Sequence, residues 1–221
     1  MPVAVIIPTL NAAPSLPATL AVLDGFGNVV VADGGSADGT RDLARAAGAL
    51  VLKAPRGRGP QLAAGAAATD APWLLFLHAD TRLGVGWRDA VERFVVEPGN
   101  ANRAGYFRLR FASEHPAARR VERLAAWRAR IIGLPYGDQG LLIARSVYEA
   151  LGGYRPLPLM EDVDFARRIG RDRLVELPAE AVTSATRYER DGWWARPARN
   201  LACLSLYFAG VPPRLIKRMY G

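Results

Sequence analysis

The chain has 221 residues, of which 50% are hydrophobic and 23% are charged, and its formal net charge at pH 7 is +8. This composition is ordinary for a globular protein and excludes the collagen-like, disordered and disulfide-rich classes. The single cysteine, Cys203, excludes an intrachain disulfide and favours a reducing compartment.

Strands and helices are predicted to alternate over the first eighty residues. Short apolar or β-branched runs predict strands at residues 3–8, 28–33, 49–55 and 73–80. Helical spacing and small residues predict helices at residues 14–23, 40–47 and 60–68. This alternation predicts an α/β fold with a mostly parallel central sheet flanked by helices. Because no repeat or low-complexity linker divides the chain, we expect a single domain.

Polar residues follow all four predicted strands. In order along the chain they are Pro8, Thr9 and Asn11, then Asp33, then Arg56 and Arg58, then His78 and Asp80. The carboxyl ends of parallel strands lie at one edge of a sheet, where ligands bind in such folds. Each residue alone could be a turn or cap residue. Together they predict one binding site at this edge.

The residue types at this edge suit a nucleotide and a metal. Asp33 offers an acceptor to a base N–H group, and Asp80 is an oxygen ligand of the kind that Mg²⁺ or Mn²⁺ accepts. Arg56 and Arg58 precede a predicted helix N-terminus, an arrangement that suits phosphate. For His78 three roles stay open, which are metal contact, hydrogen bonding to neighbours and packing, and a supporting role is favoured over ligation.

Two stretches in the second half carry carboxylates beside glycine or proline. Glu161 and Asp162 begin a predicted helix, where the helix dipole alone would explain them. Asp138 and Gln139 lie in a Gly-Asp-Gln-Gly stretch that is either a tight turn or part of a pocket. A strand at residues 141–144 follows, and Ser146 with Glu149 predicts a capping box for the next helix.

The segments that hold these residues resemble the family-2 glycosyltransferases, which have the GT-A fold. In the donor-binding half the likeness lies in VIIPTLN (residues 5–11), VVVADGGSADGT (29–40) and LLFLHADTRL (74–83). In the acceptor half it lies in YGDQGLLIARSVYEALGGY (136–154) and LPLMEDVDFARRI (157–169). Together with PRGRGPQLAAGAAA (55–68) and the C-terminal segment, the chain is similar to a short bacterial subset called radical-SAM/selenodomain-associated transferase 2.

The resemblance implies roles for the donor half, residues 1–100. Pro8, Thr9, Asn11 and Asp33 would hold the nucleoside, and Arg56 and Arg58 would lie near the diphosphate. Asp80 would be the surviving carboxylate of an Asp-x-Asp motif and would bind the divalent cation, Mg²⁺ or Mn²⁺. The chain departs from the family pattern at His78, the first position of that motif, and at Gly34, where many relatives have a second aspartate.

The resemblance also implies roles for the acceptor half, residues 101–182. Asp162 would be the general base and Glu161 its neighbour, while Asp138 and Gln139 would line the sugar or acceptor pocket. The implied reaction moves a sugar from a UDP- or GDP-sugar to an acceptor hydroxyl, with inversion by direct displacement. No residue identifies the acceptor, so a small molecule and a lipid-linked one both remain open.

The C-terminal segment, residues 183–221, combines aromatic and basic residues in a predicted amphipathic helix. Residues 181–221 hold seven basic residues against Glu189 and Asp191, and residues 103–130 hold eight Arg against two Glu. This pattern is typical of a helix on an anionic membrane surface, but equally of a helix that covers the core or forms a homodimer. We expect a cytoplasmic protein, with or without peripheral contact at the inner membrane face.

Two other functional classes remain open. A nucleotidyltransferase of related fold would also use Arg, Gly and a metal-bound Asp, but it would not need Asp162. A non-catalytic protein that binds nucleotides or anionic surfaces would explain the charge. It would leave Asp33, Asp80 and Asp162 unexplained, because carboxylates repel phosphate without a metal, and for this reason no nucleic-acid partner is expected.

Overall fold

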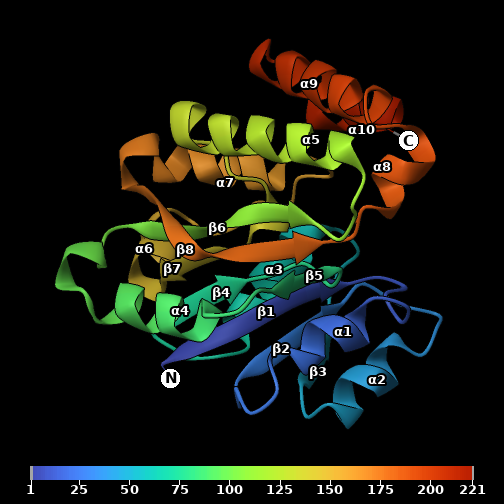
Figure 1. Cartoon of the computed structure of the whole chain (residues 1–221). Helices are drawn as coiled ribbons and strands as arrows, with labels where there is room; N and C mark the ends of the chain where they lie inside the picture. The colour runs from blue at the N-terminus through green and yellow to red at the C-terminus, as the bar shows by residue number, and fades with distance from the viewer. Residues whose placement is uncertain (1, 221) are drawn as a thin grey trace.

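The computed structural model describes residues 2–220 (Figure 1). One sheet of eight strands, in the order β3-β2-β1-β4-β7-β6-β8-β5, lies between helices. The strands are β1 (Val3–Thr9), β2 (Val29–Asp33), β3 (Leu50–Lys53), β4 (Trp73–Phe76), β5 (Thr81–Leu83), β6 (Ala104–Phe111), β7 (Leu141–Ala144) and β8 (Leu174–Thr183). The α-helices are α1 (Leu16–Ala21), α2 (Thr40–Ala46), α3 (Arg58–Ala67), α4 (Trp87–Val96), α5 (Pro116–Trp127), α6 (Arg145–Ala150), α7 (Glu161–Ile169), α8 (Thr186–Asp191), α9 (Ala195–Phe208) and α10 (Pro213–Tyr220). Short 3-10 or π turns are η1 (Pro98–Asn100), η2 (Arg128–Ile132), η3 (Gly137–Gln139) and η4 (Arg171–Arg173).

The predicted α/β fold with a mostly parallel central sheet flanked by helices is confirmed. Strand β1 pairs in parallel with β2 and β4, and β2 pairs in parallel with β3. All seven residues of β1 are buried, as expected for a central strand covered on both faces. Antiparallel β7 then joins β4 to β6, which lies parallel to β8, and β5 lies antiparallel to β8 at the edge.

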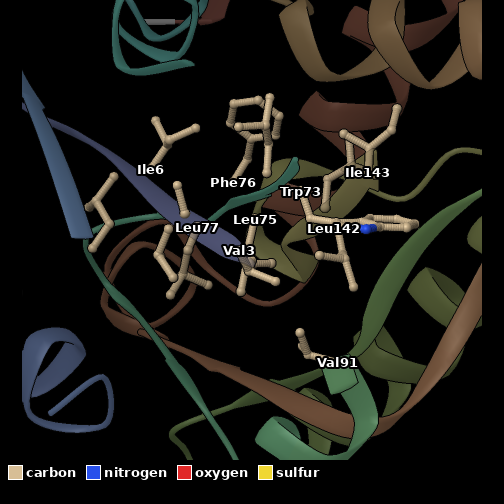
Figure 2. Packing of buried hydrophobic residues seen from close by; sticks show 14 of the residues in the cluster. Val3, Ile6, Trp73, Leu75, Phe76, Leu77, Val91, Leu142 and Ile143 are labelled. Atoms are coloured by element: carbon tan, nitrogen blue, oxygen red, sulfur yellow. The ribbon is translucent and has the colours of Figure 1, made fainter. Parts of the chain in front are cut away.

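Apolar side chains from the middle strands form the main core. Figure 2 shows Ile6 of β1, Leu75 and Phe76 of β4 and Ile143 of β7 packed together. Their continuous apolar runs leave no polar side chain inside these strands, so functional groups are confined to the strand ends. The loops that follow β1, β3 and β4 therefore form the site.

Two local predictions are wrong. Strand β4 ends at Phe76, not at Asp80, because Leu77 N donates the last hydrogen bond to β1 (Ile6 O, 3.0 Å) and the chain then turns. The predicted capping box at Ser146 is absent, since the N-cap of α6 lies two residues earlier, at Ala144, and has no side-chain cap.

Helix α3 packs closely on β1 through Gly65, which gives a stability prediction. A Cβ atom at Gly65 would lie 2.4 Å from Cγ2 of Ile6, a fully buried side chain that cannot move away. We expect Gly65→Ala to destabilise the fold by about 1–3 kcal/mol, despite the better helix propensity of alanine. Chemical denaturation measures this. Gly39→Ala is the control, because a Cβ atom added there would have no neighbour within 4 Å, and an equal loss in both variants would contradict the packing account.

The C-terminal helices α9 and α10 cover a second, smaller core. Cys203 and Leu204 of α9 and Ile216 of α10 pack with Met160 and Val163 near the start of α7. This is the core-covering arrangement that the sequence left open, and it shows Cys203 as a buried packing residue. Within residues 2–220, no helix has the length and apolar character needed to cross a membrane.

Candidate active site

Two adjoining cavities form one groove at the carboxyl ends of β1 and β4. The outer cavity has a volume of about 760 Å³ and includes the loops after β1 and β3. The inner cavity, of about 130 Å³, reaches between η3, α5 and the start of α7. Both are lined by Arg58, His78, Asp80 and Glu161, so we describe them together as the groove.

Ten of the twelve predicted site residues line this groove. The outer cavity contains Pro8, Thr9, Asn11, Arg56, Arg58, His78, Asp80 and Glu161, and the inner cavity adds Asp138 and Asp162. The exceptions are Asp33 and Gln139, which line neither cavity. Residues from five separate segments therefore converge at one place. Three of the four predicted strand-end segments are among them, and the segment of Asp33 is not.

Asp33 is fully buried and organises the loop after β2. Its carboxylate accepts hydrogen bonds from Thr9 Oγ1, Gly35 N, and both the backbone N and Oγ of Ser36. Burial alone would raise the pKa of Asp33, but the bonds from Ser36, Gly35 and Thr9 outweigh it and lower the pKa. The carboxylate is thus ionised and occupied by the chain's own donors, and its direct contact with a nucleotide stays a prediction.

Asn11 joins the loops after β1 and β2. Its backbone has φ +50°, its Oδ1 accepts from Ala37 N (2.9 Å), and its own N donates to Ser36 Oγ (2.8 Å). An asparagine tolerates this left-handed conformation better than most residues do. The two loops that border the outer cavity are therefore held together before any ligand arrives.

Gln61 is a site-supporting residue that the sequence analysis missed. Its Nε2 donates to Thr9 O (2.6 Å) and Ala32 O (2.8 Å), so it ties together the ends of β1 and β2. A Cβ atom at Gly34 would lie 3.1 Å from this side chain. Gln61 therefore occupies the space beside Gly34, which gives a physical reason for the departure from the family's second aspartate.

Helix α3 begins at Arg58 and closely approaches the loop before α7. A Cβ atom at Gly59 would lie 2.2 Å from Arg155 O, so only glycine allows this approach. The approach brings Arg58 Nη1 to 3.6 Å from Glu161 Oε1. Burial opposes the charge on Arg58, but Glu161 and Asp162 outweigh this and raise its pKa.

His78 and Asp80 follow β4 and differ in their surroundings. A Cβ atom at Gly137 would lie 2.4 Å from His78 Nε2, so the imidazole packs against that glycine. Burial and the nearby Arg58 lower the pKa of His78 to about 4, so the ring is neutral at pH 7. The Asp80 carboxylate lines both cavities, and within residues 2–220 no hydrogen bond or ion pair engages it.

Asp162 and Glu161 lie in the first turn of α7, behind Met160 at φ +66°. Asp162 Oδ2 accepts from Gly137 N (3.0 Å) and Oδ1 from Val163 N (2.8 Å). These bonds hold the carboxylate at the inner cavity in one orientation. Burial, followed by the charge of Asp162, raises the pKa of Glu161 to about 6, against the influence of Arg58.

Asp138 and Gln139 have opposite environments. Oδ1 of Asp138 is buried at the inner cavity without a hydrogen-bond partner among the described residues. Gln139 is 1% exposed, donates to Phe107 O (3.1 Å) and accepts from Arg128 Nη2 (3.1 Å). The expectation that Gln139 lines the pocket is therefore not met, because its amide is used to fix η3 against β6.

The buried Asp138 carboxyl gives a pH-dependent stability prediction. Burial raises its pKa to about 6 from an ordinary value of 3.8, so the folded state binds more protons than the unfolded state between these values. Stability is therefore lost as the pH rises from about 4 to about 6. We expect Asp138→Asn to raise stability at pH 7 by on the order of 1–3 kcal/mol and to leave it unchanged below pH 4. Denaturant titrations at pH 3.5 and 7 test this, and an equal effect at both values would contradict it.

The C-terminal segment supplies a side of the groove that the sequence analysis did not assign. Arg187, Arg190, Arg196 and Lys217 line the outer cavity, and Arg187 and Arg196 also line the inner one. Arg196 is buried, donating to Asp191 Oδ2 (2.8 Å) and to the Tyr220 hydroxyl (2.6 Å). The signal in the sequence was the excess of basic residues after residue 181, but its location required the packing of α9 and α10.

A comparison with protein families assigns the first part of the chain to a known family. The profile of glycosyl transferase family 2 matches residues 4–133, which is more than half of the chain. The chain belongs to glycosyl transferase family 2. The matched residues include β1, β3 and β4 with the segments after them that carry Asn11, Arg58 and Asp80. The family match therefore covers one side of the groove, whereas Asp138 and Asp162 lie beyond residue 133.

Solved structures show the same fold at low sequence identity. TarS 1–349 from S. aureus has a TM-score of 0.68 and 13% identity, covering 100% of this chain and 69% of that one. Glucosyl-3-phosphoglycerate synthase from Mycobacterium tuberculosis, solved with Mn²⁺ and UDP-glucose, has a TM-score of 0.58 and 17% identity, covering 82% and 69%. No curated protein sequence matches the chain. These likenesses establish the GT-A fold of this glycosyltransferase family member.

Proposed function

We propose that this family-2 glycosyltransferase transfers a sugar from a nucleoside-diphosphate sugar to an acceptor hydroxyl with inversion. The observation that carries the proposal is the convergence of Arg58, Asp80 and Asp162 on one groove from three different elements. The Arg58 cation and the Asp80 carboxylate, which has no protein partner among the described residues, suit a diphosphate and its metal ion. The oriented carboxylate of Asp162 suits an acceptor hydroxyl. A UDP- or GDP-sugar is the proposed donor, and the acceptor is a small or lipid-linked alcohol.

In the proposed reaction, Asp162 accepts the proton of the acceptor hydroxyl. The hydroxyl oxygen forms a bond to the anomeric carbon while the bond from that carbon to the diphosphate oxygen breaks on the opposite face. Arg58, with Arg56 beside it, stabilises the negative charge that gathers on the leaving diphosphate. Glu161 holds the Arg58 guanidinium at the junction of the two cavities (3.6 Å), which makes it a positioning residue.

Asp80 is suited to be the one protein ligand of a divalent cation whose other ligands come from the substrate and from water. Among the described residues, no cluster of three or more His, Cys, Asp or Glu side chains is arranged to hold a metal alone. A cation bound mainly by diphosphate oxygens and water needs only one protein carboxylate, and the Asp80 carboxylate is free to serve. Mg²⁺ or Mn²⁺ would neutralise charge on the diphosphate. One structure of the mycobacterial synthase contains UDP with Mn²⁺, and another contains UDP with Mg²⁺.

The two halves of the chain would then bind different substrates. Residues 1–100 would bind the donor, with Pro8, Thr9, Asn11 and His78 around the nucleotide and Asp33 supporting the loop. Residues 101–182 would bind the acceptor, with Asp138 in the inner cavity. The further assignment to the radical-SAM/selenodomain-associated transferase 2 subset rests on the sequence motifs, and a cytoplasmic location fits the single buried Cys203.

Donor hydrolysis followed by proton NMR tests the proposed reaction without knowledge of the acceptor. Water can replace the acceptor slowly, and the anomeric proton of the first sugar released reports its configuration. From an α-linked UDP- or GDP-sugar with Mn²⁺ we expect the β-sugar first. Release of the α-sugar first would contradict direct displacement. If no donor releases its nucleotide, even with acceptor mixtures present, the proposed transfer is wrong.

A further inference from the structure

Exposed apolar side chains are concentrated on two segments of this protein. Of the thirteen large apolar residues that are exposed within residues 2–220, nine lie in residues 124–132 and 194–219. Scattered exposed apolar residues are normal on a protein surface, but a contiguous group marks an interaction site. The concentration therefore needs an explanation that core packing does not give.

The first group forms a stripe on α5 and its continuation η2. Leu124, Trp127 and Ile131 are spaced three and four residues apart and are 60%, 56% and 50% exposed. On another side of the same helix, Val121 and Ala125 are buried over the sheet. The helix is thus amphipathic with a second apolar face that points away from the protein.

The second group lies on α9 and α10. Trp194, Leu201 and Phe208 follow at intervals of seven residues, which places them on one side of α9. Figure 1 shows α5 and α9 next to one another at the top of the molecule. The guanidinium of Arg120 on α5 lies 4.4 Å from the ring centre of Trp194, so the two stripes meet at this stacked pair. Helix α10 adds exposed Leu215 and Met219.

This surface is surrounded by cations. Residues 192–221 contain five Arg or Lys and no Asp or Glu. Arg214, Lys217 and Arg218 on α10 and Arg123 on α5 are exposed, and none of these four forms an ion pair with another described residue. An apolar surface with a basic border complements an anionic lipid bilayer. It does not complement itself, because a second copy would bring like charges together.

We propose that the α5–α9 surface, formed by the exposed faces of α5–η2, α9 and α10, docks this protein on anionic membranes. Its apolar side chains enter the interfacial region and its Arg and Lys side chains meet lipid phosphates. Helix α10 also lines the groove through Lys217 and Tyr220, so docking places the groove mouth at the edge of the lipid surface. Membrane binding of this kind does not require the proposed reaction.

Vesicle flotation tests this proposal with the full chain. We expect binding to phosphatidylcholine vesicles that contain phosphatidylglycerol, weaker binding to phosphatidylcholine alone, and release by high salt. The double variant Leu124→Ser/Trp127→Ser should bind these vesicles at least about tenfold more weakly, because it replaces two apolar side chains that would be buried in the lipid. The matched control is Val85→Ser/Val96→Ser, which changes two exposed apolar residues outside the surface.

A second variant tests the contribution of charge separately from that of the apolar side chains. Because it changes only exposed residues, it also provides a test that does not depend on the folding of the first variant. Arg214→Gln/Arg218→Gln removes two exposed cations from α10 and should reduce the preference for anionic vesicles. Equal binding by the wild type and both double variants would overturn the proposal, as would equal binding to both kinds of vesicle. Sedimentation equilibrium that shows a dimer lost in Leu124→Ser/Trp127→Ser would instead assign the surface to a second copy of the chain.

Discussion

Asp162→Asn should lower kcat for sugar transfer by about 10²–10⁴-fold, the range over which a positioned general base contributes. The amide has nearly the same shape as the carboxylate but cannot accept the acceptor's proton. Its remaining oxygen can still accept one of the two backbone hydrogen bonds, from Gly137 N or Val163 N, so the fold should persist. Donor binding should change little, because Arg58 and Asp80 remain.

Steady-state kinetics with the cognate donor, together with calorimetric titration of the free nucleotide, separate these effects. Asp172→Asn is the matched control, since it makes the same chemical change at an exposed aspartate outside the groove. A wild-type kcat in Asp162→Asn would remove this residue from the reaction. In that case Asp138, another carboxylate that lines the inner cavity, becomes the first candidate for the base.

Asp80→Ala should lower kcat/KM by on the order of 10²–10³-fold, as expected when one preorganised electrostatic contact to the leaving group is removed. The carboxylate has no described protein partner, so its loss should not destabilise the fold. The activity that remains should no longer respond to Mn²⁺ or Mg²⁺ in the way that the wild-type activity does. Kinetic titrations of each ion with both proteins measure this difference.

Asp70→Ala serves as the control for Asp80→Ala, because Asp70 is an exposed aspartate before β4 and lies outside both cavities. An unchanged ion dependence in Asp80→Ala would show that the metal, if used, is held elsewhere. A large loss of stability in the same variant would show that the carboxylate has a structural role.

The first half of the fold was predictable because each strand is a separate apolar run. The strands β1, β2 and β4 carry no polar side chain before their ends, and the helices between them have helical spacing. The second half was less accessible. Strand β6 pairs with β8 across about seventy residues, with a register shift between Phe107 and Arg108, and no local pattern specifies such a pairing. The apolar spacing of α4, in contrast, could have been found.

The site was predictable to the extent that it lies at strand ends. Arg58 and Asp80 follow different strands, and parallel pairing places the carboxyl ends of those strands at the same edge of the sheet. Three features depended on tertiary contacts instead. Gln61 is a helix residue whose amide happens to reach two strand ends, Gln139 turns inward to β6, and the basic residues of α8 to α10 reach the groove only after those helices fold back.

A thermal-shift panel of UDP, GDP, dTDP, ADP and CMP, each with Mn²⁺, Mg²⁺ or EDTA, tests the central claim most directly. A ligand that binds the native state raises the melting temperature by mass action, so one experiment examines donor and ion together. We predict a shift with UDP or GDP that requires the divalent ion and is absent in Asp80→Ala. The absence of a shift with every nucleotide and ion would contradict a nucleotide-sugar site in this groove.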